Sequence, residues 1–414
     1  MEQEKSLSTP LNRITVVDAL RGFALLGVIL IHMLQHYGIF SFANMGVPRE
    51  AQFPVLDEAI RWLSDNVISG RFINIFAFLF GLSFFIQMDR AAKKGTDFRA
   101  RFIWRMAILF IIGLIGNCFY TGDIMSIYAV FGIILVLFYR FKSWILILIA
   151  TLLLLGAPRI IKTGYENMTK TEQVQNQDAN TQRPAFRPPM NMEEPSFLNS
   201  AKNNLTRGMD MKLNYQFGMF GRGFVTLALF ILGFIVGRIR FFEEVDTRKK
   251  RNLILFAGFV IAVTAINWII DLFPPQPTGF FMRPDMEITP TLLTVMALKD
   301  VSSVLFSGAL IIGFIILYQM KGIGKCLDIM TPYGRMGLTN YEMQSVIGCL
   351  IFSMWAFGSI FGDWGRTEVF ALGLVIYTMQ VIISKYWMKY FLYGPFEWLW
   401  RSATYLKIQP FRRK

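Results

Sequence analysis

The sequence predicts an all-α membrane protein, a bundle of about ten transmembrane helices with both termini in the cytoplasm. Of its 414 residues, 54% are hydrophobic and only 17% are charged, whereas an ordinary soluble domain carries about 25% charged residues. Apolar runs of 17 or more residues recur along the chain, and each is long enough to cross a hydrocarbon core about 30 Å thick. The mean hydropathy of +0.44 agrees with this composition.

Ten apolar segments are the candidate spans. The first follows a polar N-terminal stretch and is too long and too charged for a cleaved signal peptide, so we expect it to be retained. The ten segments are 14–37, 70–88, 102–119, 123–139, 143–161, 219–237, 252–272, 299–319, 337–360 and 367–388.

Basic residues predict the orientation of these spans. The stretches 90–105 and 238–251 each hold six Lys or Arg, and such loops normally face the cytoplasm. Ten spans place both stretches on the same side, together with the basic turn 139–142. The net charge of +14 is therefore explained by membrane topology. We expect the lipid bilayer, and no nucleic acid, as the partner of this charge, and the oligomeric state is left open.

The spans divide the chain into five parts. The long loop between the fifth and sixth spans is rich in Asn, Gln and Pro, which favours poor order in its first half. In the last part Glu397 and Arg401 are four residues apart, and we expect them to pair on an amphipathic helix at the membrane surface. The parts are a cytoplasmic tail (1–13), spans one to five (14–161), an extracytoplasmic loop (162–218), spans six to ten (219–388) and a cytoplasmic amphipathic segment (389–414).

The first span carries both histidines of the chain and an Asp–Arg pair. At about 100° per residue, Asp18, His32 and His36 fall within one stripe of the helix, and Arg21 lies one turn from Asp18. Arg21 and His32 are about 16 Å apart along the helix axis. Charged groups at such depth normally face the bundle interior or a wet cavity. We therefore predict an inward polar stripe, with an interfacial Asp–Arg anchor and a structural core histidine as the alternatives.

Other polar residues lie at the membrane depths of Arg21, on the cytoplasmic side, and of His32, on the outer side. Asn117 and Asp123 lie at the outer ends of the third and fourth spans, where a carboxylate can orient an imidazole and raise its basicity. On the inner side Arg101 and Arg105 share a helical face, and arginine pairs suit anionic phosphates. Positive-inside anchoring explains the same two arginines equally simply.

The ninth span contains the polar residues Asn340 and Gln344. These residues could contact a ligand, or they could form hydrogen bonds between helices, and the sequence favours neither role. A metal site is not expected, because the chain has two His, three scattered Cys and no metal-binding motif.

Five stretches carry a resemblance to a known family: "VVDALRGFALLGVILIH", "FAFLFGLSF", "GDIMSIYA", "GRMGLTNYEMQS" and "SKYWMKYFLYGPFEWLWR". They resemble the YeiB-like family of bacterial membrane proteins, over nearly the whole chain apart from about 160–218. More distantly, the first span resembles the transmembrane acyltransferase superfamily, which includes the bacterial acyltransferase-three proteins and the lysosomal glucosaminide acetyltransferase.

The two acyltransferase branches point to different histidines. The acyltransferase-three proteins share an Arg and a His separated by ten residues, matched here by Arg21 and His32. They also share an Arg-rich inner site, which Arg101 and Arg105 loosely resemble. The lysosomal branch shares Val-Asp-x-x-Arg-Gly and has its functional His after this helix, for which His36 is the nearest match. Which histidine acts is left open.

The resemblance implies a membrane-embedded acyltransferase of the bacterial cytoplasmic membrane. It would move an acyl group from cytoplasmic acyl-CoA, with acetyl-CoA as the first candidate, to a hydroxyl or amine of an extracytoplasmic small molecule or glycan. The alternative is a transporter of a small anionic solute that uses Asp18, Arg21 and His32. The candidate catalytic residues are His32, His36, Asp123 and Asn117, and the candidate donor-binding residues are Arg21, Asp18, Arg101, Arg105, Asn340 and Gln344.

Overall fold

The computed structural model describes residues 14–39, 52–173, 194–276 and 288–413, and its elements there are helices. The N-terminal half contains α1 (Thr15–Leu34), η2 (His36–Gly38), α2 (Pro54–Leu63), η4 (Ser64–Ile68), α3 (Arg71–Ala92), α4 (Arg99–Phe119), α5 (Met125–Phe138), α6 (Ser143–Leu154), α7 (Ala157–Gln173), α8 (Phe197–Leu205) and α9 (Arg207–Phe217). The C-terminal half contains α10 (Arg222–Arg238), η5 (Phe241–Glu243), α11 (Lys249–Asp271), α12 (Pro290–Tyr318), α13 (Lys321–Leu327), α14 (Met330–Arg335), α15 (Gly337–Phe352), α16 (Gly358–Phe361), α17 (Arg366–Tyr390) and α18 (Pro395–Tyr405).

The helices have the lengths and composition of membrane spans, which confirms the predicted fold class. Six of those described are long and apolar enough to cross a membrane: α1, the stretch Pro54–Ala92 that contains α2, η4 and α3, and the helices α4, α11, α12 and α17. The pairs α6–α7 and α9–α10 are bent by 53° and 60° at short breaks. The described part therefore has up to eight spans if each bent pair counts as one.

Two of the ten predicted spans form helices shorter than a bilayer requires. The predicted spans 123–139 and 337–360 contain α5, of 14 residues, and α15, of 16 residues, whereas a span needs about 17 to 25 residues. Both helices are largely buried among their neighbours. Their lengths are therefore set by packing inside the protein rather than by the thickness of the membrane.

The predicted loop 162–218 is helical where the structure describes it. Helix α7 continues to Gln173, and α8 and α9 fill the part after residue 193. The side chain of Ser196 caps α8 by accepting a hydrogen bond from the Asn199 N–H at 3.2 Å. The expectation of poor order concerns residues 174–193, and these lie outside the described residues, as does the tail 1–13.

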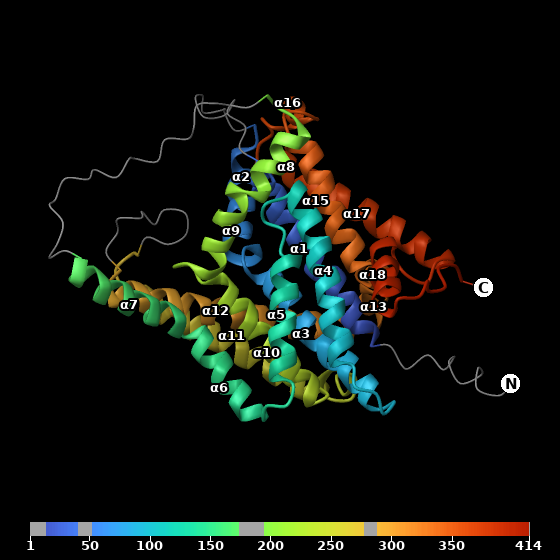
Figure 1. Ribbon diagram of the computed structural model, residues 1–414, viewed down its shortest axis with the longest axis horizontal. Coiled ribbons are helices and arrows are strands. Elements are labelled where there is room, and N and C mark those ends of the chain that lie inside the picture. Colours follow the sequence, from blue (N-terminus) through green and yellow to red (C-terminus); the bar gives the residue numbers. More distant parts are fainter. Residues whose placement is uncertain (1–13, 40–51, 174–193, 277–287, 414) are drawn as a thin grey trace.

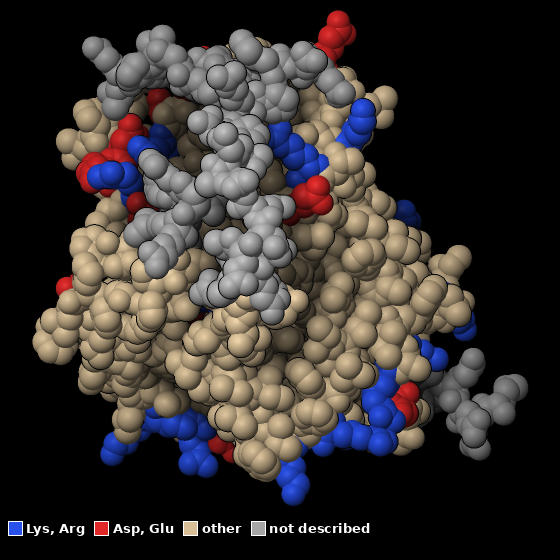
Figure 2. All heavy atoms as spheres, turned by 60° about the vertical axis from the view of Figure 1, so that its left-hand side comes forward, with Lys and Arg blue, Asp and Glu red and all other residues tan. Residues whose placement is uncertain are grey.

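The basic connections of the chain meet at one end of the bundle, which we call the basic end. Arg240, after α10, pairs with Asp89 of α3 at 2.9 Å, and Arg238 donates to the backbone oxygen of Phe141 at 2.6 Å. In Figure 2 the basic end is at the bottom, where Lys and Arg lie below a broad uncharged band. Helices α2, α8 and α16 lie at the other end, the opposite end (Figure 1).

Helices α3 and α10 cross with their backbones in close approach. A Cβ atom added at Gly81 would lie 2.0 Å from the backbone oxygen of Phe230, and one at Gly233 would lie 2.0 Å from that of Phe78. Small residues at such crossings allow the backbone contact on which helix association in lipid depends. The two glycines therefore fix the distance between these central helices.

Gly81→Ala is expected to destabilise the protein by about 1 to 3 kcal/mol, because the added methyl group forces α3 and α10 apart. The matched control is Gly258→Ala in α11, where an added Cβ meets nothing within 4 Å. Thermal unfolding in detergent should show a lower midpoint for Gly81→Ala and an unchanged or higher midpoint for the control. Equal midpoints for the two variants would contradict the close crossing.

Candidate functional site

The Asp18–Arg21 pair predicted for the first span forms inside the bundle. Asp18 is 2% exposed and accepts a hydrogen bond from Nη1 of Arg21. Nη2 of Arg21 donates to Oγ of Ser83 on α3 at 2.7 Å. The pair thus links α1 to α3 instead of anchoring α1 at a lipid-exposed surface.

The two histidines of α1 and η2 lie against aromatic rings near the opposite end. His32 is 9% exposed, and its ring centroid lies 4.8 Å from that of Tyr120 and 5.4 Å from that of Tyr37. His36 packs on Phe352 at 4.7 Å. His32 therefore faces the interior, as the helical stripe predicts.

A buried lysine lies close to two of the predicted site residues. Lys212 of α9 is 7% exposed, and its Nζ donates to Oδ1 of Asn117 at 3.0 Å and to Oγ of Ser126 at 2.9 Å. Its charge also interacts with the carboxylates of Asp123 and Glu342. We call these five residues the carboxylate–lysine cluster.

The two carboxylates of this cluster converge on one point of α4. A Cβ atom at Gly116 would lie 2.4 Å from Oε2 of Glu342 and 3.1 Å from Oδ2 of Asp123. Asp123 is fully buried and Glu342 is 4% exposed. Oε1 of Glu342 has no hydrogen-bond partner among the described residues. The cluster thus holds two acidic groups close together, with a single lysine interacting with both.

Tyr120 connects His32 to this cluster. It lies three residues before Asp123, with which it interacts electrostatically, and its ring packs on His32. The structure thereby brings His32, Asp123 and Asn117 into one region, while the His36 ring packs on Phe352, which also stacks on Tyr37.

Asn340 and Gln344 make hydrogen bonds between helices. Nδ2 of Asn340 donates at 3.0 Å both to the backbone oxygen of Tyr333 and to Oγ of Ser384. Nε2 of Gln344 donates to the Tyr333 hydroxyl at 2.7 Å and to Oε1 of Gln380 at 3.4 Å. These bonds form a network that joins α14, α15 and α17, and contact with a ligand stays a prediction for the two residues.

Arg101 and Arg105 lie at the basic end against the C-terminal helix α18. The Arg105 guanidinium stacks 3.6 Å over Trp400, and Arg101 lies 5.2 Å over the ring of Tyr405. Arg401 also lies 5.2 Å over Tyr405. Stacking uses the faces of the guanidinium groups, and Nε of Arg105 and Nε of Arg401 are buried without hydrogen-bond partners among the described residues. We call Arg101, Arg105 and Arg401 the arginine cluster.

Glu397 binds a different partner from the one predicted. Its carboxylate accepts hydrogen bonds from the N–H groups of Leu338 and Thr339 at 2.7 and 3.1 Å and from the Thr339 hydroxyl at 2.6 Å. The expected pair with Arg401 is wrong, because the free N–H groups at the start of α15 are stronger partners for a carboxylate. Burial raises the pKa of Glu397, and the bonds from Thr339 and Leu338 oppose this rise.

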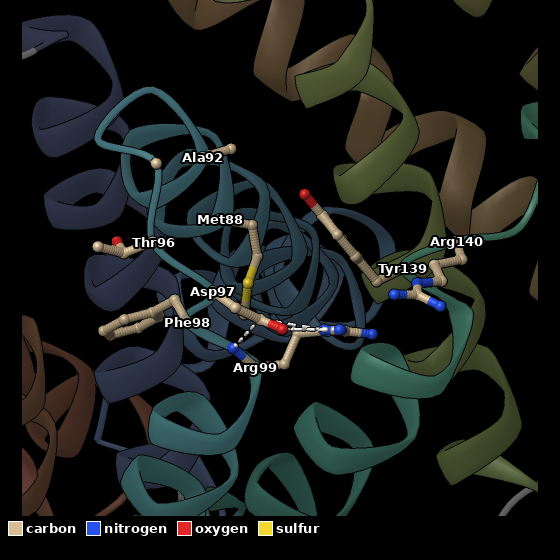
Figure 3. Close-up of a pocket in the computed structure, with 9 residues that line it drawn as sticks. Met88, Ala92, Thr96, Asp97, Phe98, Arg99, Tyr139 and Arg140 are labelled. Atoms are coloured by element: carbon tan, nitrogen blue, oxygen red, sulfur yellow. Dashed lines mark hydrogen bonds and ion pairs between the residues drawn. The ribbon is translucent and has the colours of Figure 1, made fainter.

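A pocket of about 270 Å³ lies at the basic end, beside the connection between α3 and α4 (Figure 3). Met88, Tyr139 and Arg140 line it, together with Asp97 and Arg99. Hydrogen bonds from Arg99 lower the pKa of Asp97 to about 2, so this pair remains charged. The residues lining the pocket include none of the predicted site residues.

Three charged residues of these clusters were not among the predicted site residues. Lys212 was missed because it lies in a polar stretch with the composition of a loop. Arg401 was missed because it lies in a tail whose sequence is typical of a surface amphipathic helix. Glu342 stands inside a predicted span, and a carboxylate at that depth was a usable signal. Within the described ranges, no three His, Cys, Asp or Glu lie close enough together to hold a metal ion.

The fold and these clusters define a multi-pass helical membrane protein that keeps charged groups inside its bundle. Residues 236–407 match a family model described as a protein of unknown function (DUF418). The chain is 27% identical to the uncharacterized protein YxaH of Bacillus subtilis, over 97% of this chain and 96% of that protein. It is 22% identical to the uncharacterized protein YeiB of Escherichia coli, over 95% of this chain and 97% of that protein.

A third relative is an uncharacterized 39.9 kDa protein of Bacillus acidopullulyticus, 26% identical over 96% of this chain and 95% of that protein. These similarities along nearly the whole chain confirm the predicted YeiB-like resemblance. The more distant resemblance to transmembrane acyltransferases remains a prediction.

Lys212→Met is expected to destabilise the protein by about 3 to 5 kcal/mol, because it leaves two buried carboxylates without a cation. Adding Glu342→Gln should recover part of this loss, so the double variant should lose less than the two single losses combined. Unfolding in mixed micelles measures the three variants, and Lys202→Met, at an exposed position of α8, is the control. A Lys212→Met loss no larger than that of Lys202→Met would contradict this role of the lysine.

Proposed function

We propose that the protein is a membrane-embedded acyltransferase that moves an acyl group from cytoplasmic acyl-CoA to a hydroxyl or amine acceptor on the other side of the membrane. The observation that carries this proposal is the position of His32. Its imidazole is buried between two tyrosine rings, on the same helix as the Asp18–Arg21 pair.

His32 is the proposed general base. It removes the proton from the acceptor hydroxyl or amine while the acceptor atom bonds to the thioester carbonyl carbon. The carbon–sulfur bond then breaks, and the CoA thiolate takes a proton from the imidazolium to leave as free CoA. Asp123 and Asn117 are positioning residues in this proposal, because the carboxylate–lysine cluster holds Tyr120 against the imidazole.

The arginine cluster is the proposed site for the CoA phosphates. Arg101, Arg105 and Arg401 lie at the basic end with their faces stacked on aromatic rings. The in-plane N–H groups of a stacked guanidinium can still make forked hydrogen bonds to phosphate oxygens. Arg21 lies between this end and His32, and the acyl-pantetheine arm would pass along α1.

This reaction needs the basic end in the cytoplasm, where acyl-CoA is found, and the positive-inside rule favours the same orientation. The three relatives come from bacteria, and we propose the bacterial cytoplasmic membrane as the location. The acceptor would be a small molecule or an envelope glycan.

The test follows acetyl groups from labelled acetyl-CoA to an envelope glycan extract, with the protein in lipid nanodiscs. His32→Gln is expected to lower the rate of transfer and CoA release by about 100-fold or more. His36→Gln is the matched control, because its ring packs on Phe352, and it should change the rate much less. Thermal unfolding verifies that both variants fold.

Arg105→Gln and Arg401→Gln separate donor binding from chemistry. Each should raise the KM for acetyl-CoA by about tenfold, the effect of one charge-assisted hydrogen bond, with a smaller change in kcat. An unchanged rate in both histidine variants, with both folded, would overturn the proposal. Loss of activity in His36→Gln alone would move the base to His36.

Transport of a small anionic solute is the second candidate function, favoured by the two broken helix pairs. The breaks of 53° between α6 and α7 and of 60° between α9 and α10 resemble the discontinuous helices of secondary transporters. Uptake of labelled anions into liposomes, without release of CoA from acetyl-CoA, would favour this function over acyl transfer.

A further inference from the structure

Helices α3 and α10 begin in the same way. Each starts with an arginine, Arg71 or Arg222, directly after a glycine in the left-handed conformation. These glycines, Gly70 and Gly221, have φ values of 75° and 60°, which only glycine adopts readily. Within the described residues no side chain caps either helix start. Both N-termini therefore keep the partial positive charge of the helix dipole.

The two helix starts lie next to each other. Nη2 of Arg222 donates to the backbone oxygen of Gly70 at 3.3 Å and also hydrogen bonds to Oδ1 of Asn74. Asn74 in turn donates to Oγ of Ser303 and Oγ of Ser307 on α12, at 3.2 and 3.1 Å. Three helices thus meet where the two positive helix ends lie together.

Arg159 reaches the same place from the break between α6 and α7. It is 4% exposed, donates to the backbone oxygen of Phe220 at 2.7 Å and pairs with Asp300 of α12. Its Nε lies 2.8 Å from the position of a Cβ at Gly221. Its Nε and Nη1 are buried with no hydrogen-bond partner in the described part of the chain. A buried guanidinium group with two unused nitrogens is costly unless a ligand binds them.

Among the described residues, the charges around this place do not balance. Three guanidinium groups, those of Arg71, Arg159 and Arg222, interact with two carboxylates, those of Asp65 and Asp300. Two uncapped helix N-termini add further positive potential. Nε of Arg71 is also buried without a partner among the described residues. The electrostatics and the unused donors both favour an anion with several oxygens.

We propose that the adjacent starts of α3 and α10, together with Arg159, form a binding site for a phosphate-type oxyanion. Helix N-termini bind phosphate groups through backbone N–H groups and the helix dipole. Arginines add forked, charge-assisted hydrogen bonds to the same oxygens. The anion is an inorganic phosphate, a phosphate ester or the phosphate of a lipid headgroup.

This oxyanion site shares no residue with His32 and its neighbours. Phe76 stacks on Tyr128 and on Tyr341, with ring centroids 6.0 Å apart in each pair. Tyr341 belongs to the His32 side, since its hydroxyl accepts the Ile124 N–H at 3.2 Å. The oxyanion site therefore does not depend on acyl transfer, and it is tested by binding alone. It lies at the helix breaks on which the transport alternative rests.

The test titrates inorganic phosphate into the full-length protein in phosphatidylcholine nanodiscs, followed by calorimetry at constant ionic strength. Arg222→Gln should weaken binding by about tenfold or more, because it removes a charged donor. Asp300→Asn should strengthen binding, because it removes a competing carboxylate. Arg61→Gln, at an exposed arginine that pairs with Glu58 on α2, should leave binding unchanged.

The opposite signs expected for Arg222→Gln and Asp300→Asn separate a binding effect from a folding defect, since a misfolded variant does not bind more tightly. A second arm adds phosphatidylglycerol to the nanodiscs and measures retained lipid by native mass spectrometry. Lipid retention without binding of free phosphate identifies the headgroup as the source of the phosphate. Absence of both, or equal binding in all variants, overturns the proposal.

Discussion

The burial of Lys212 is the constraint on which the packing of helices toward the opposite end of the bundle depends. An isolated ammonium or carboxylate in an apolar interior is prohibitively costly, so the lysine must meet its carboxylates wherever the helices place them. Its contacts with Asn117 and Ser126, and its charge interaction with Asp123 and Glu342, join helices that are far apart in the sequence. These helices, α4, α5, α9 and α15, are held in one arrangement by the need to pair that charge.

The charged groups of the interior are distributed from the basic end toward the opposite end of the bundle. Arginines lie on aromatic rings at the basic end, the Asp18–Arg21 pair bonds to Ser83 of α3, and His32 lies among tyrosines toward the other end. A reaction that crosses a membrane needs such an order, with a site for the donor on one side and a base on the other. Arg159 and Arg222, at the breaks α6–α7 and α9–α10, add a third positive region.

Periodicity along α1 was enough to predict the part of the candidate site that lies on that helix. The spacing of Asp18, Arg21 and His32 on one helical face correctly predicted both the ion pair and the inward direction of the histidine. Helical periodicity does not assign a role to Asn340 and Gln344, because a polar residue in a span gives the same sequence pattern whether it binds a ligand or another helix. Their bonds to Tyr333 and Ser384 follow from the packing of α14 and α17.

The sequence by itself determined that the protein folds in a lipid bilayer, that it is helical, and which face of a single helix carries the charged groups. Hydrophobic run length and helical period are local properties of the chain, so no knowledge of neighbouring helices is needed to read them. Only the tertiary structure decided which charges meet. Lys212, Arg105 and Arg159 come from stretches distant in sequence from their partners, and Glu397 binds the start of α15 instead of its own helical neighbour. Pairing in an apolar interior depends on distances between helices, and these are set by backbone contacts such as that of Gly81 with Phe230.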